Sequence, residues 1–100
     1  MFSCGDQSDD VNYKEMIDNG AIIIDVRSES EFKESSIEYS INIPLNTLSS
    51  SLNDIDKNQV IIVCCLSGKR SSKAKEMLKS NGYKNVFNGG GWKDLENKIK

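Results

Sequence analysis

Histidine is absent from all 100 residues of this sequence. The chain therefore cannot build a Ser-His-Asp or Cys-His catalytic group, and it lacks the side chain that most often carries protons near neutral pH. A metal site is also disfavoured, because there is no imidazole and the adjacent pair Cys64 and Cys65 lacks zinc-ligand spacing. We expect neither a metal nor a cofactor, and any nucleophile must be activated without a histidine base.

Cysteine and long apolar runs are also scarce. Three cysteines, two of them adjacent, do not make the disulfide framework of a small secreted domain, so a reducing, cytoplasmic location is the simplest interpretation. No apolar run is long enough to span a bilayer, and no membrane partner is expected. The segment around Cys4 resembles the end of a bacterial lipoprotein signal, so a lipid-anchored or exported protein whose upstream signal was removed is the alternative.

Length and charge restrict the remaining possibilities. A chain of 100 residues is one domain, and 37% hydrophobic with 28% charged residues is a globular balance. The net charge of −2 gives no reason to expect a nucleic-acid partner. Residues 1–9 are polar and lack periodicity, so we expect a flexible N-terminal tail followed by a domain over residues 10–100.

Two unbroken β-branched runs, residues 21–26 and 60–64, predict strands covered on both faces, which is typical of a parallel sheet. Shorter strands are expected around residues 41–43 and at residues 86–87, with residues 89–91 as a glycine turn.

Helical patterns alternate with these strands. Asp10 or Asn12 can cap a first short helix, and Ser28 or Ser30 a second. Residues 45–58 predict one or two short helices. After the loop, the apolar stripe of Ala74, Met77 and Leu78 predicts the best-defined helix, which ends at Asn81 and Gly82. A closing helix places Trp92, Leu95 and Ile99 in the core. This alternation predicts an α/β fold with a doubly wound parallel sheet.

The stretch over residues 60–72 predicts a strand, a short loop and a helix, with Cys65 at the end of the strand. Open α/β folds place ligand sites at such junctions. Backbone N–H groups of residues 66–70 can form an anion nest, the next helix presents its positive end, and Lys69 and Arg70 add charge. Together they can lower the pKa of the Cys65 thiol from its usual value of about 8.5, which makes Cys65 the candidate nucleophile. Gly68 suits a loop that closes around an anion, because such a loop needs residues that tolerate a positive φ or near contact with a ligand.

For Asp25 and Cys64, which lie near this loop, a structural role has to be weighed against a functional one. Asp25 ends the other buried strand at the same sheet edge, where it can bond the loop amides or pair with Arg27 or Arg70. A structural role for Asp25 is favoured over a catalytic one. Cys64 points to the opposite face of its strand from Cys65 and is assigned to the core.

Residues 65–71 read Cys-Leu-Ser-Gly-Lys-Arg-Ser and resemble the active-site loop Cys-x-Ser-Gly-x-Arg-Ser of the rhodanese-like, or sulfurtransferase, domain family. Supporting matches lie at residues 24–27 with 31–32, at 41–44 and at 82–91. The resemblance implies a five-stranded parallel sheet with helices on both faces. It also implies that Cys65 takes a sulfane sulfur from thiosulfate, polysulfide or persulfide and passes it to an acceptor such as cyanide or a thiol, which can belong to a protein. The residues that it assigns to substrate binding are Leu66, Ser67, Gly68, Lys69 and Arg70, and those that it assigns to support are Asp25, Arg27 and Ser71.

Loop length separates this family from related phosphatases, whose loop is one residue longer. Cys65 to Arg70 spans six residues, the sulfur-transfer length. Leu66 departs from the pattern, because many single-domain members carry arginine there, and this favours persulfide or polysulfide donors over thiosulfate. The alternatives are a carrier or non-catalytic module that docks partner proteins, and a redox protein that uses Cys64 with Cys65.

Overall fold

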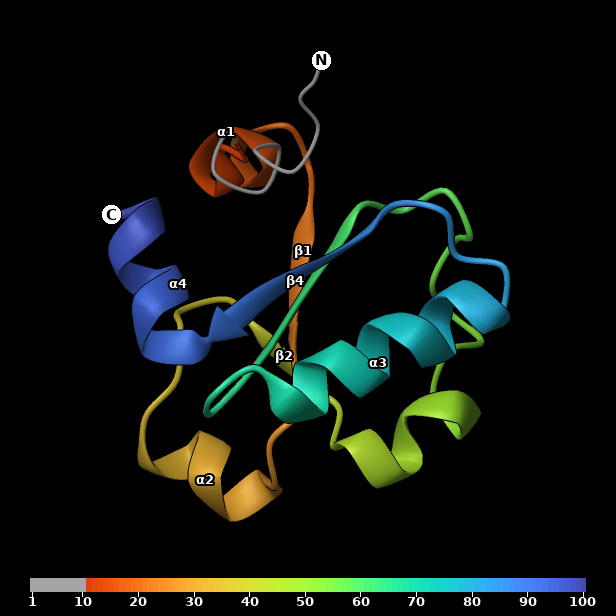
Figure 1. The fold of residues 1–100 in the computed structure, drawn as a ribbon, viewed down its shortest axis with the longest axis horizontal. Coiled ribbons are helices and arrows are strands. Elements are labelled where there is room, and N and C mark those ends of the chain that lie inside the picture. Colours follow the sequence, from red (N-terminus) through yellow and green to blue (C-terminus); the bar gives the residue numbers. More distant parts are fainter. Residues whose placement is uncertain (1–10) are drawn as a thin grey trace.

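Four parallel strands form the centre of the fold over residues 11–100, the part of the chain that this computed structural model describes (Figure 1). The strands are β1 (Ile22–Asp25), β2 (Ile41–Asn42), β3 (Ile61–Cys65) and β4 (Val86–Gly91). Their order in the sheet is β2-β1-β3-β4, so each of the two buried runs lies in the middle. This is the predicted α/β fold with a parallel sheet, and the described residues form four strands rather than five.

Helices cover both faces of the sheet. On one face lie α1 (Tyr13–Asp18) and α4 (Trp92–Ile99), and on the other lie α3 (Lys69–Ser80) and the 3-10 helix η2 (Leu45–Ser50) (Figure 1). The short helix α2 (Glu29–Glu34) follows the carboxyl end of β1. Two apolar cores result, and all five residues of β3 are buried between them, as an unbroken apolar run requires.

Helix ends follow the predicted capping signals. The Asn12 side chain accepts the Glu15 N–H and caps α1, whereas Asp10 lies outside the described residues. Ser28 and Glu31 form a reciprocal capping box on α2. Helix α3 ends at the predicted place, with Asn81 as its C-cap. Each end is thus satisfied locally, which explains why short-range sequence signals find it.

The prediction for residues 86–91 was wrong at its carboxyl end. Glycines weaken the strand signal, so residues 89–91 were assigned to a turn, but β4 continues through them to Gly91. Val63 pairs with Asn88 and Cys64 with Gly90, which leaves Gly89 as the extra residue of a β-bulge. Gly90 has φ of +82°, a conformation open to glycine. The bulge brings the end of β4 beside Cys65, with which Gly91 pairs.

Candidate active site

Cys65 is the last residue of β3, and its side chain packs in the core beneath α3 with 1% of its surface exposed. Cys64 packs into the opposite core with Trp92 and Leu95. Successive strand residues alternate in direction, so the two neighbours lie in different surroundings. Both are free cysteines. Burial, followed by the negative charge of Asp25, raises the pKa of the Cys64 thiol, which agrees with the core role predicted for Cys64.

The loop after Cys65 bends back so that its N–H groups meet the sulfur. Gly68 N donates to Cys65 Sγ at 3.0 Å, and Ser71 N lies 3.4 Å from the same atom. Gly68 has the predicted positive φ, +99°, at the position that begins α3. This conformation turns the first N–H groups of α3 toward the sulfur, which therefore occupies the positive end of the helix.

The pKa of the Cys65 thiol is lowered from its ordinary value. Burial opposes this, because it disfavours the charged thiolate, but the Ser71 side chain and the N–H groups of Ser71, Gly68 and Ser67 outweigh burial. The ionised sulfur in turn helps to raise the pKa of Arg70, so this cation also favours the thiolate. Hydrogen bonds are therefore the main means by which the loop activates a thiol that has no histidine.

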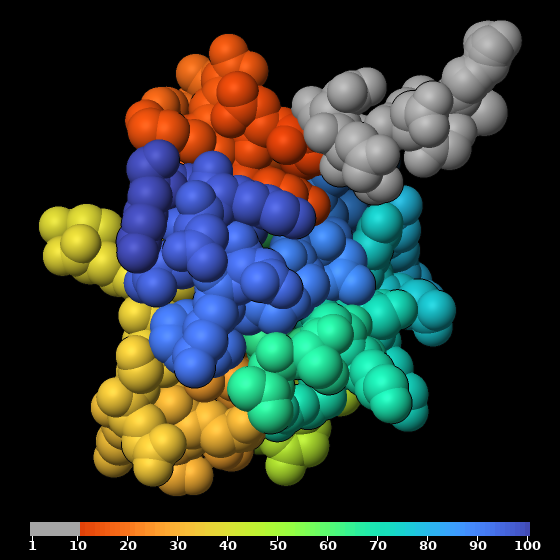
Figure 2. All heavy atoms as spheres, turned by 60° about the vertical axis from the view of Figure 1, so that its left-hand side comes forward, coloured from red at the N-terminus to blue at the C-terminus, as the bar shows by residue number. Residues whose placement is uncertain are grey.

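Arg70 forms a bidentate ion pair with Glu31 of α2. Its Nη1 and Nη2 atoms donate to the two carboxylate oxygens at 2.8 and 3.0 Å. Glu31 also accepts the Ser28 N–H in the capping box, and these bonds, with that of Arg70 first, lower the pKa of Glu31 to about 2. The pair joins the start of α3 to α2. In Figure 2 the teal segment that begins α3 lies against the orange segment that contains α2. Glu31 was not predicted as a site residue, although its capping-box spacing was visible in the sequence.

Asp25 pairs with Arg27, one of the two cations considered for it. Arg27 Nε and Nη2 donate to Asp25 Oδ2 at 2.9 and 2.7 Å, and both residues are buried. The guanidinium also lies 4.8 Å from the centre of the Trp92 ring and donates to the Ser35 carbonyl. The pair braces the carboxyl edge of the sheet below the loop, which supports the structural reading of Asp25.

Ser71 is fully buried and bonds to both the sulfur and the strand behind it. Its Oγ atom lies 3.4 Å from Cys65 Sγ and 2.7 Å from Asn88 Oδ1. Sequence reasoning missed Asn88, because no local pattern distinguishes an asparagine before a run of glycines. Its position depends on the pairing of β4 with β3 and on the bulge.

Three loop side chains face solvent. Leu66 is 59% exposed, and Ser67 and Lys69 are exposed too. Of these three residues, Ser67 contributes a backbone N–H group that lowers the pKa of the Cys65 thiol. Two hollows flank the loop. Arg70 lines one of about 750 Å³ together with Val26, Ser28 and Thr47, and Leu66 lines another of about 420 Å³ with Glu31 and Trp92. Small reactants thus have room on both sides of the Arg70–Glu31 pair.

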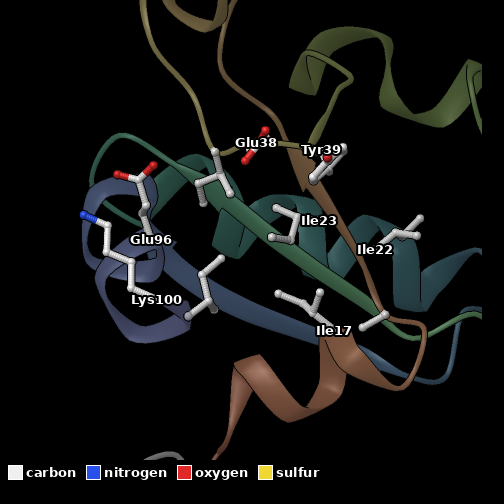
Figure 3. A pocket seen from close by; sticks show the side chains of 10 residues that line it. Ile17, Ile22, Ile23, Glu38, Tyr39, Glu96 and Lys100 are labelled. Carbon is white, nitrogen blue, oxygen red and sulfur yellow. The ribbon is translucent and has the colours of Figure 1, made fainter.

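A further cavity of about 400 Å³ lies away from this loop, toward the amino end of β1 (Figure 3). Isoleucines such as Ile17, Ile22 and Ile23 line it, and Glu38, Glu96 and Lys100 are also part of its wall. It contains no cysteine, so the chemistry belongs to the loop. Residues 11–100 contain no cluster of acidic or cysteine side chains able to hold a metal ion, and none of their helices is long and apolar enough to cross a membrane.

Comparisons with known proteins bear on the family and the fold of this chain. A family model, the rhodanese-like domain, matches residues 10–98. The thiosulfate sulfurtransferase PspE of Escherichia coli is 38% identical over 74 residues, which are 72% of this chain and 71% of that protein. YrkF of Bacillus subtilis, named as a candidate sulfur carrier protein, is 34% identical over 71% of this chain and 38% of its own length. A solved structure of a rhodanese with anions from Escherichia coli has a TM-score of 0.68 at 37% identity over 74% of this chain and 89% of that chain.

Proposed function

This chain belongs to the rhodanese-like domain family, and on that premise we propose that it is a sulfurtransferase in which Cys65 carries a sulfane sulfur as a persulfide. The observation that carries the proposal is the environment of Cys65 Sγ, which accepts loop N–H groups in a six-residue loop and has a lowered thiol pKa. A thiolate formed in this way needs no general base.

The transfer divides into two displacements at sulfur. The Cys65 thiolate attacks the sulfane sulfur of the donor; a bond from Sγ to that sulfur forms, the donor S–S bond breaks, and its electron pair leaves with sulfite or a thiolate. The acceptor, cyanide or a thiolate, then attacks the outer sulfur and releases the Cys65 thiolate, so the enzyme undergoes no net redox change. The N–H groups of Ser67, Gly68 and Ser71 hold the negative charge in both steps.

The remaining site residues have roles that follow from their contacts. Leu66, Ser67, Gly68, Lys69 and Arg70 form the substrate-binding loop, the exposed ones through their backbone. Ser71 supports the sulfur directly, whereas Asp25 and Arg27 support the edge of the sheet on which the loop is built.

We further propose that persulfides or polysulfides are better donors than thiosulfate. Leu66 offers no charge to a dianion, and the charge of Arg70 is balanced by Glu31. Relative rates of persulfide formation with thiosulfate, polysulfide and a low-molecular-weight persulfide test this, and clearly faster loading by thiosulfate would contradict it. A reducing location, the cytoplasm, suits a free Cys65, with a lipid-anchored or exported protein as the alternative.

A carrier is the second candidate, in which partner proteins deliver and remove the sulfur. The exposed Leu66 beside the nucleophile and the likeness to YrkF favour it. Ready persulfide formation with weak turnover toward cyanide would identify a carrier, whereas turnover with cyanide at a rate comparable to loading would identify the enzyme. The six-residue loop argues against a phosphatase.

Intact mass spectrometry tests the central proposal. The reduced protein is incubated with thiosulfate or polysulfide, and a gain of one sulfur atom is expected. The gain should disappear in Cys65→Ala and persist in the matched control Cys64→Ala, which retains the loop. Absence of added sulfur, or an addition that survives Cys65→Ala, would refute the role of Cys65.

A further inference from the structure

Asn88 of β4 lies directly behind Ser71 in the active-site loop. Its Oδ1 atom accepts Ser71 Oγ–H at 2.7 Å and Gly90 N–H at 2.9 Å, and its Nδ2 atom lies 3.5 Å from the Gly68 carbonyl. Two donors facing one end of the amide and a carbonyl facing the other determine the orientation of this side chain. The bulge at Gly89 contributes, because it places Gly90 N–H where Asn88 Oδ1 can accept it.

Ser71 has one hydroxyl proton and three neighbouring acceptors. They are Asn88 Oδ1 at 2.7 Å, the Gly68 carbonyl at 3.1 Å and Cys65 Sγ at 3.4 Å. Ser71 is fully buried, so its hydroxyl is out of contact with bulk solvent. While its proton points to Asn88, Ser71 offers only lone pairs to the sulfur, and it can accept from a thiol S–H but cannot stabilise a thiolate.

Ionisation of Cys65 reverses what the sulfur needs from Ser71. A thiolate only accepts hydrogen bonds, so the hydroxyl must turn from Asn88 Oδ1 to Cys65 Sγ to support it. Asn88 Oδ1 then still accepts the Gly90 N–H, and no buried acceptor is left unpaired. When Sγ is bonded to a second sulfur in a persulfide, it loses its full charge and the hydroxyl can return to Asn88.

We propose that Asn88 is a positioning residue for the nucleophile: its side-chain oxygen competes with Cys65 Sγ for the single hydroxyl proton of Ser71 and so opposes formation of the thiolate. Ser71 keeps its proton throughout and only changes its direction, while the thiol proton leaves to solvent. By opposing ionisation, Asn88 keeps the pKa of the Cys65 thiol from falling further. This preserves reactivity, because the intrinsic nucleophilicity of a thiolate falls as its pKa falls. The inference rests on Cys65 as the nucleophile of the proposed function, but it assumes no particular donor or acceptor.

The charged groups around this site stay the same when Asn88 is exchanged. On α3 they are Arg70, which is paired with Glu31 of α2, and the exposed Lys69. At the end of β1 they are Asp25 and Arg27, which are paired with each other. On β3 the neighbouring titratable group is the Cys64 thiol, whose pKa burial raises. On α1 it is Tyr13, whose hydroxyl donates to the backbone carbonyl of Asn88 at 3.2 Å and whose pKa burial also raises. A side-chain exchange at Asn88 retains that carbonyl. A changed titration of Cys65 in an Asn88 variant would therefore report the hydrogen bonds of Ser71.

The test is the pH dependence of Cys65 alkylation by iodoacetamide, read by peptide mass spectrometry that separates Cys4, Cys64 and Cys65. In Asn88→Ala the midpoint is expected to move to lower pH by about 0.5 to 1. This is the effect of one hydrogen bond, because the Ser71 hydroxyl no longer has to leave Asn88 Oδ1 before it donates to the thiolate. In the Ser71→Ala background the same exchange should leave the midpoint in place. A midpoint that stays or rises in Asn88→Ala, or that moves equally in both backgrounds, would overturn the proposal.

A second measurement uses the unaltered protein and so does not depend on the folding of a variant. The Asn88 side-chain carbonyl carbon is followed by ¹³C NMR as Cys65 titrates, with the assignment taken from the isotope-labelled chain. Its resonance should shift with the midpoint of Cys65 alkylation, because Oδ1 loses one of its two donors, and this shift should vanish in Ser71→Ala. A resonance that does not follow Cys65 would refute the competition. Neither measurement needs sulfur transfer, so a failure of the proposed function and a failure of this inference are separate results.

Discussion

Replacement of Arg27 by methionine should destabilise the fold strongly, because it leaves the Asp25 carboxylate buried without its cation. Asp25 and Arg27 are 0% and 3% exposed, and two guanidinium nitrogens reach the carboxylate at 2.7 to 3.0 Å. Breaking such a buried pair from one side costs about 3 to 5 kcal/mol. Methionine replaces the apolar stem of the arginine but not its guanidinium, so the contact of that group with the Trp92 ring is lost together with the charge.

Urea unfolding followed by circular dichroism measures this loss. With a urea m-value of about 1 to 3 kcal/mol per molar for a small domain, the midpoint should fall by at least about 1 M. The exposed pair of Lys14 and Asp18, with side chains 56% and 63% exposed, is the matched control. Lys14→Met removes a cation from a solvated pair and should change stability by less than about 1 kcal/mol.

A double variant distinguishes a lost ion pair from a disturbed core. Asp25→Leu together with Arg27→Met removes both charges, and apolar replacement of a whole buried pair is often neutral or stabilising. The double variant should therefore recover much of the stability lost in Arg27→Met. If Arg27→Met costs no more than Lys14→Met, or if the double variant is the least stable of the three, the reasoning about the buried pair is refuted.

Further outcomes follow from the loop. Glu31→Gln keeps the capping box and removes the charge facing Arg70. The wild type should be more stable than this variant by an amount that is fully present above the usual Glu pKa of 4.5 and that declines as pH falls toward about 2. A stability difference that grows in acid would contradict the pairing. Gly68→Ala forces a side chain into φ of +99° and should cost about 1 to 2 kcal/mol in urea unfolding while slowing persulfide formation; unchanged loading would show that this conformation is not needed. Ser71→Ala removes the leading hydrogen bond that lowers the Cys65 pKa, so the midpoint of its alkylation should move to higher pH, and a downward movement would contradict that role. Leu66→Arg should improve loading by thiosulfate several-fold at low salt and less at high salt, with loading by a neutral persulfide as the control.

Local signals were enough for much of the fold. The two β-branched runs became the buried central strands, and Asn12, Ser28 and Asn81 cap helices as their positions predicted. Such features depend on a few neighbouring residues, because a cap or a strand-to-helix loop is satisfied by groups close in the chain. The same holds for Gly68, whose positive φ belongs to the loop itself.

Local sequence signals did not predict which charged side chains pair across the fold. Asp25 had more than one available partner, and only the packed sheet edge placed it against Arg27 beneath Trp92. Glu31 meets Arg70 across 39 positions of the sequence, and the charges alone gave no preference among several acidic residues. These choices depend on where separate elements come together in space.

The sequence by itself determined that Cys65 ends a buried strand, that a six-residue loop returns the chain over it, and that a thiol without histidine must be activated by backbone groups. The tertiary structure alone decided what surrounds that loop: Glu31 balances Arg70, and the bulged end of β4 places Asn88 against Ser71. The physical reason is the separation along the chain of the residues that interact. A loop and its helix are set by contiguous residues, whereas Asn88, the partner of the buried Ser71 outside the loop, comes from a strand whose register is determined by pairing with β3.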